Sequence, residues 1–176
     1  MKTLLFTNGK TMLKTIMKSS THLPMAAMFL SAVLTGTAAA ENQVPFKGSL
    51  EGASSITPLD VQLIFVRTNG TGNATQLGSY TLDIPHVVTK GTGIGTMTFT
   101  AANGDTLNAV FTGHAPPPTG IPPVTSIVET AVITGGTGRF SGATGNFIVT
   151  RSFNFATNLT TGSFEGTISS PGAGKP

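Results

Sequence analysis

Short runs in which apolar and polar residues alternate fill most of the chain after residue 41, and this two-residue period constrains the fold more than any other feature. Successive side chains of a β-strand point to opposite faces, so the alternation predicts strands with one buried face. Gly, Asn, Asp and Pro separate the runs, as turns require. The sequence therefore predicts an all-β fold with about eight strands, near residues 44–51, 59–67, 76–84, 86–101, 105–113, 124–134, 146–156 and 162–169.

Turn-forming residues predict where these strands are connected. Asn103-Gly104 predicts a two-residue hairpin of type I′, because both positions of that turn need positive φ. Residues 69–73 and 158–162 are expected to form two further connections. Residues 115–123 hold five prolines, which donate no hydrogen bond to a sheet, so this segment is expected to be a loop. Short loops between successive strands favour a single eight-stranded antiparallel up-and-down barrel, with a β-sandwich as the alternative.

The alternation also predicts which side chains share a buried face of each strand. Most of these rows are wholly apolar, whereas two of them each contain one charged residue. The predicted rows are Val61, Leu63 and Phe65; Tyr80, Leu82 and Ile84; Met97, Phe99 and Ala101; Leu107, Ala109 and Phe111; Ile127, Glu129, Ala131 and Ile133; and Phe147, Val149, Arg151, Phe153 and Phe155.

The first forty residues have the composition of a secretory signal peptide. Four lysines and no acidic residue occur in the first twenty positions, a short apolar run follows over residues 23–34, and Ala38-Ala39-Ala40 offers a cleavage site. The apolar run is shorter than the ~20 residues that a membrane-spanning helix needs. We therefore expect a signal peptide over residues 1–40, a β-barrel domain over residues 41–176, and secretion to an extracellular or periplasmic location.

Removal of this segment changes the charge of the protein. The whole chain has a net charge of +3, but residues 41–176 carry six basic and seven acidic residues, a net charge of −1. Scattered charges of this kind argue against nucleic-acid binding, which needs a basic patch. One Tyr and no Trp argue against a membrane-spanning barrel with its aromatic girdles, and the absence of Cys excludes disulfides and thiol catalysis. A net charge near zero is compatible with homo-oligomers.

Three polar residues in apolar rows are the candidate ligand-binding residues. Glu129 and Arg151 belong to predicted neighbouring strands, and if both rows face inward they form a buried ion pair, since an unpaired buried charge is very costly. Such a pair is either a polar anchor or acid/base group in a cavity or a structural salt bridge, and the further alternative is that the row faces solvent. Tyr80, the only tyrosine, alternates with Leu82 and Ile84, and it is either part of a ligand site or a core residue with a satisfied hydroxyl.

The sequence predicts no catalytic residue, metal site or cofactor. His86 and His114 stand alone at strand ends, without the further ligands at set spacings that metal sites show. No Gly-x-Ser-x-Gly motif of a serine nucleophile is present. The Gly-rich segment Gly135-Gly136-Thr137-Gly138 is followed by a strand pattern rather than by a helix, so it is read as a turn rather than as a phosphate cradle.

This Gly-rich segment and the strands around it, residues 129–147, resemble the allene oxide cyclase and dirigent barrels of plants. Those barrels have a Gly-Gly-(Ser/Thr)-Gly-x-Phe-x-Gly-x-x-Gly turn between two strands, and this chain matches its glycines at Gly135, Gly136, Gly138, Gly142 and Gly145. The same motif and the ending Phe164-Glu-Gly-Thr-Ile-Ser-Ser-Pro are similar to those of secreted bacterial proteins of unassigned function.

The resemblance implies an eight-stranded barrel with an apolar cavity, but not a particular reaction. The cyclases use a cavity glutamate helped by a cysteine, whereas this chain has no Cys, and Glu51 does not align with that glutamate. We therefore expect a secreted barrel without a catalytic site, which binds a small apolar ligand or acts as an extracellular structural or interaction module. The alternative is an isomerase or cyclase that steers a reactive intermediate inside the barrel.

Overall fold

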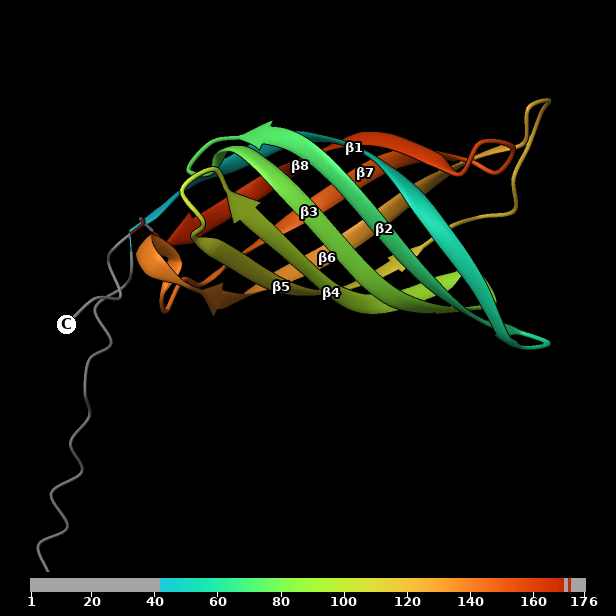
Figure 1. Cartoon of the computed structure of the whole chain (residues 1–176), viewed down its shortest axis with the longest axis horizontal. Helices are drawn as coiled ribbons and strands as arrows, with labels where there is room; N and C mark the ends of the chain where they lie inside the picture. Colours follow the sequence, from blue (N-terminus) through green and yellow to red (C-terminus); the bar gives the residue numbers. More distant parts are fainter. Residues whose placement is uncertain (1–41, 170, 172–176) are drawn as a thin grey trace, which may run out of the picture. The chain divides into compact units, whose positions relative to one another are not determined.

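The computed structural model describes residues 42–169 and residue 171, and these residues form a closed antiparallel barrel (Figure 1). Eight strands follow one another around the barrel in chain order, and β1 pairs with β8 to close it. The prediction of an up-and-down barrel is thus confirmed, and the chain does not form the alternative sandwich. The predicted signal peptide lies outside the described residues.

The elements are β1 (Gln43–Asp60), β2 (Leu63–Ala74), β3 (Gly78–Thr89), β4 (Thr92–Ala101), β5 (Thr106–His114), β6 (Val124–Gly136), the 3-10 turn η1 (Gly138–Phe140), β7 (Gly145–Asn154) and β8 (Leu159–Ser169).

The connections lie at two ends of the barrel, which differ in character (Figure 1). At the η1 end, residues 75–77, 102–105 and 137–144 connect the strands. At the opposite end, called the proline-loop end, residues 61–62, 90–91, 115–123 and 155–158 do so. The loop at residues 115–123 is the proline-rich connection that the sequence predicts.

Two predicted connections are wrong. Residues 69–73 lie inside β2, where they pair with β1 and β3. The Tyr80 hydroxyl occupies the space that a side chain at residue 72 would need, since a Cβ there would lie 2.5 Å from it. The last hairpin loop is at residues 155–158 rather than 158–162, with Asn158 at φ +56°.

Two hairpins also differ in detail from the prediction. The predicted strand 86–101 is two strands, because Lys90 and Gly91 turn the chain with φ of +48° and +78°. A turn at Asn103-Gly104 is confirmed, but its predicted two-residue type I′ form is wrong, because only Gly104 of the two has positive φ. Ala101 N–H donates to the Asp105 carbonyl and Gly104 N–H to the Ala101 carbonyl, so residues 102–104 form a three-residue loop between the paired Ala101 and Asp105. A type I turn followed by a left-handed Gly is the usual form of such loops.

Aromatic side chains fill the half of the barrel toward the η1 end. The rings of Phe46, Phe99, Phe147 and Phe164 contact one another at centroid distances from 4.9 to 6.2 Å, mostly edge to face or tilted. Phe140 of η1 is fully buried beside them. This half of the interior is a packed core, held by the burial of large apolar surfaces.

Most of the predicted inward rows are buried, including those that contain Glu129 and Arg151. The row Val61, Leu63 and Phe65 is wrong, because Val66 and Thr68 face the interior on β2 and Val61 is 95% exposed. Residues 63–66 are all apolar, so the sequence does not show which of them face the interior at this end of the strand. Phe155 was also expected in a buried row, but it lies in the last hairpin loop and is 43% exposed.

Candidate functional site

The inward positions toward the proline-loop end include several polar side chains among apolar ones such as Ile127 and Phe153, in contrast to the aromatic half. Hydroxyl, imidazole, carboxylate and guanidinium groups from six strands face the interior there, and each residue is at most 9% exposed. Glycines occupy the inward positions of β4 and β5 beside them. We call this set the polar belt: Ser54, Thr68, His86, Glu129, Arg151 and Thr160.

Glu129 and Arg151 form a bidentate ion pair at the centre of the polar belt. Arg151 Nε donates to Glu129 Oε2 at 3.0 Å, and Arg151 Nη2 donates to Glu129 Oε1 at 2.7 Å. Glu129 pairs with Val149 and Arg151 with Ile127, so the two residues are diagonal neighbours on β6 and β7. Arg151 Nη1 lies 3.4 Å from Thr160 Oγ1, and that hydroxyl donates to the Ser152 carbonyl at 2.9 Å. The guanidinium and the carboxylate therefore neutralise each other and share two hydrogen bonds inside the barrel.

A glycine faces each long polar side chain from the neighbouring strand. Gly113 pairs with Glu129 and Gly162 with Arg151, and a Cβ on either glycine would lie 2.5 Å from the partner's side chain. Gly95 pairs with His86 in the same way, with no room for a Cβ beside the His86 Cβ. These glycines make the interior wide enough for the polar belt. Sequence reasoning missed them, although they stand at inward positions of their strands.

His86 is a member of the polar belt that sequence reasoning considered only as a metal ligand. Its Nδ1 lies 3.0 Å from the Ile84 carbonyl, which only accepts, so Nδ1 carries a proton and donates in this hydrogen bond. Burial, followed by the Arg151 charge, lowers the pKa of His86, while the Ile84 carbonyl and Glu129 act in the opposite direction. The ring also packs edge to face on Phe111, with centroids 5.6 Å apart.

A small cavity of about 40 Å³ lies beside His86, Glu129 and Arg151. Gly93 and Gly113 form part of its wall, and Gly91 and Ala115 line it toward the proline-loop end. A volume of this size holds a few water molecules. Ligand pockets for small molecules are larger, roughly 300–1,000 Å³.

Comparison with solved structures identifies the architecture. The pterocarpan synthase dirigent protein PsPTS1 matches 74% of this chain and 96% of its own chain, with a TM-score of 0.53 and 13% sequence identity. A second pterocarpan synthase dirigent protein, GePTS1, matches 73% of this chain and 84% of its own, with a TM-score of 0.49 and 14% identity. This chain has the dirigent-like barrel fold. No family model matches its sequence, and no curated protein matches it either.

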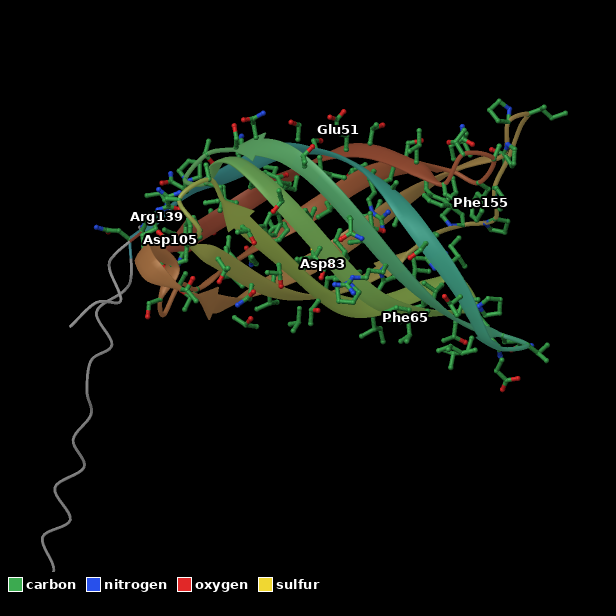
Figure 2. All side chains as sticks on the ribbon, in the orientation of Figure 1. Glu51, Phe65, Asp83, Asp105, Arg139 and Phe155 are labelled. Carbon is green, nitrogen blue, oxygen red and sulfur yellow. The ribbon has the colours of Figure 1, made fainter. Side chains whose placement is uncertain are left out.

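Tyr80 and Glu51 lie apart from the ion pair of this dirigent-like barrel. Tyr80 packs on Phe99 and Phe164 in the aromatic half, and its hydroxyl donates to the Ser49 carbonyl at 2.7 Å. Burial raises the pKa of Tyr80 well above its ordinary value. Glu51 projects from the outer face of β1 into solvent (Figure 2), where it lines a broad groove of about 920 Å³ across β8, β1, β2, β3 and β4. Glu51 is therefore not a cavity glutamate.

The Gly-rich turn of the dirigent-like barrel lies between β6 and β7 at the η1 end. Four of its glycines have φ values that disfavour other residues: Gly135 (+116°), Gly138 (+57°), Gly142 (+72°) and Gly145 (+144°). The fifth, Gly136, leaves no room for a Cβ because the Thr106 carbonyl lies against it. Asp105 ties the turn to the β4–β5 hairpin (Figure 2), since its carboxylate accepts from Arg139 N at 3.2 Å and from Asn103 Nδ2 at 2.9 Å.

Neither a metal cluster nor a membrane-spanning helix is found in the part of the chain that the structure describes. There, no three or more His, Asp or Glu side chains are grouped so that they could hold a metal ion. No helix among the same residues is long and apolar enough to cross a membrane.

Proposed function

We propose that residues 41–176 act as a secreted, non-enzymatic interaction module, with the dirigent-like barrel as a rigid scaffold and its outer surface and loops as the binding elements. The observation that carries this proposal is the bidentate Glu129–Arg151 pair, in which the carboxylate and the guanidinium inside the barrel already neutralise each other through two hydrogen bonds. A charge kept for a ligand or for acid–base chemistry needs a free side toward a cavity that can hold the ligand, and the cavity beside this pair has a volume of only about 40 Å³.

The aromatic half of the interior supports the same proposal. Phe46, Phe99, Phe147 and Phe164 pack against one another where a resemblance to dirigent proteins implies an apolar cavity. Binding of an apolar ligand there requires these rings to move apart, which loses packing contacts. An isomerase or cyclase needs a chamber for its intermediate, and the cavity beside Glu129 supplies only about 40 Å³.

The composition of the outer surface supports a role in interaction. The outward positions of β4, β5, β6 and β7 hold no Asp, Glu, Lys or Arg, and several are exposed β-branched apolar residues. Such surfaces are typical of contact sites rather than of fully solvated walls. Contact with a second copy of the chain remains a prediction, which light scattering after size exclusion tests. The exposed apolar residues on this wall are Ile94, Val110, Val128, Val132 and Ile148.

Native mass spectrometry of the protein from the medium of its own producer tests the proposal. We expect a chain that begins at Glu41 and carries no small-molecule adduct. An adduct of a few hundred daltons that is released on denaturation would show that the interior holds a ligand. Recovery of the full-length chain from inside the cells, and none from the medium, would contradict secretion.

A further inference from the structure

The loops at the two ends of the barrel differ in where their large apolar residues point. At the η1 end, the loop residues Leu77 and Phe140 are 3% and 0% exposed. At the proline-loop end, Val61 is 95% exposed and Ile121 is fully exposed, and Leu59, Phe155 and Leu159 beside them are 43–55% exposed. Loop tips in water normally carry polar residues, so exposed apolar tips that occur, among the described loops, only at the proline-loop end indicate a binding partner.

The two most exposed residues stand on the two segments that project furthest from this end. Figure 1 shows the β1–β2 hairpin and the loop at residues 115–123 reaching beyond the rest of the barrel, on opposite sides of its mouth. Val61 is one of the two connecting residues of the hairpin, and Ile121 lies in the loop. A flat surface laid across this end of the barrel would therefore meet the two projections first.

Local hydrogen bonds hold both projections in place. The Asp60 carboxylate accepts from Val61 N at 2.6 Å, which leaves the Val61 side chain directed outward. Thr119 and Val124 pair through two backbone hydrogen bonds at the base of the proline loop. Phe155 N donates to the Pro123 carbonyl at 3.0 Å, so Phe155 lies against the loop (Figure 2). The apolar tips are thus presented in a fixed arrangement.

The charge of this end indicates which kind of surface it fits. Among its described connecting residues and the strand ends beside them, Asp60 and Lys90 are the charged groups, one of each sign. An anionic surface is recognised by clusters of Lys and Arg, which are absent here. A protein partner needs a continuous complementary patch of roughly 800 Å², whereas these apolar residues stand on separate projections. A fluid, electrically neutral interface accepts separate points of insertion.

We propose that this protein docks on a zwitterionic lipid surface by inserting Val61 and Ile121, with Phe155 at the level of the headgroups. The barrel then stands on the membrane with its η1 end toward water, attached peripherally rather than spanning the bilayer. This inference rests on the proposed role as an interaction module and names its partner.

Flotation of residues 41–176 with phosphatidylcholine vesicles tests the proposal. We expect the protein to float with the vesicles, and Val61→Ser and Ile121→Ser each to weaken binding about tenfold, since each removes an inserted apolar side chain. Val87→Ser is the matched control, because Val87 is also exposed (40%) but lies on β3, outside both the apolar wall of β4–β7 and the connections of the proline-loop end, and it should bind like the wild type. Circular dichroism checks that all variants fold.

Failure of the wild-type protein to float, or equal loss from Val87→Ser and Ile121→Ser, would overturn the proposal. Binding that requires anionic lipid and disappears at high salt would also contradict it, because it would indicate recognition by charge. None of these outcomes changes the mass that native mass spectrometry records. A ligand-free protein that ignores vesicles would therefore overturn the lipid partner and leave the interaction module standing.

Discussion

Arg151 and Glu129 are joined by two parallel hydrogen bonds of 3.0 and 2.7 Å inside the barrel, where their side chains are 3% and 2% exposed. Removing two charges from water is costly, and their mutual attraction offsets this cost only when the geometry is good and the remaining polar atoms are satisfied. Thr160 supplies the further contact. The pair is therefore stable as a unit, and neither residue can be lost alone without leaving a buried charge.

The pH dependence of the free energy of unfolding should reveal the lowered pKa of the buried His86. Burial lowers the pKa of His86 in the folded state, so between that value and the unfolded value of about 6.5 the unfolded chain binds more protons. The contribution of His86 is complete above about pH 6.5 and is lost as the pH falls below it. Urea unfolding at a series of pH values should show a smaller acid loss for His86→Gln than for the wild type.

The control for this experiment is His114→Gln, which removes an exposed imidazole from the proline-loop end. An acid loss that is reduced equally in both variants would show that the buried position of His86 is not its cause. Parallel profiles for the wild type and His86→Gln would mean that His86 does not change its protonation on unfolding.

Gly113 should not tolerate a methyl group, whereas Gly93 should. A Cβ at residue 113 would lie 2.5 Å from Glu129 Cγ, so Gly113→Ala displaces the ion pair, and we expect a loss of about 1–3 kcal/mol. Gly93 pairs directly with Gly113, but a Cβ there finds His86 Cδ2 at 3.6 Å, an ordinary contact. Chemical unfolding of both variants measures the difference. Equal stabilities would show that the space opposite Glu129 is not filled.

Tyr80 gives a spectroscopic probe of the aromatic half, because it is the only tyrosine and the chain has no tryptophan. Since burial raises its pKa, phenolate absorbance should appear only above the ordinary value of about 10, or together with unfolding. Tyr80→Phe removes the hydrogen bond to the Ser49 carbonyl and should lower stability by about 1 kcal/mol. Titration of the folded protein near pH 10 would contradict the buried position.

Strict alternation made most of the inward rows predictable. Along β6 and β7, every second residue faces the interior for about ten positions, so the sequence placed Glu129 and Arg151 in otherwise apolar rows and predicted an ion pair if both rows face inward. The neighbouring order of these strands followed from the short Gly-rich turn between them. Alternation failed at residues 63–66, because four apolar residues in succession do not show which side chains face the interior.

The function of individual glycines could not be read from the sequence. The segment around Gly70 and Gly72 has the composition of a turn, yet both residues lie in β2. Glycine is needed there because neighbouring atoms approach the backbone too closely for a Cβ. Gly95, Gly113 and Gly162 leave space for His86, Glu129 and Arg151, but this role depends on the register between strands. Register fixes which glycine faces which side chain, and it becomes known only when the barrel closes.

We expect the Glu129–Arg151 pair to stabilise the barrel as a unit, and equilibrium unfolding of a double-mutant cycle measures this role. We predict that Glu129→Leu and Arg151→Met each lower the free energy of unfolding by about 3–5 kcal/mol, and that the double variant recovers most of this loss. The double variant keeps the test decisive if a single variant fails to fold. Single variants that equal or exceed the stability of the wild type would contradict the claim, because stability gained on removal is typical of residues held for function.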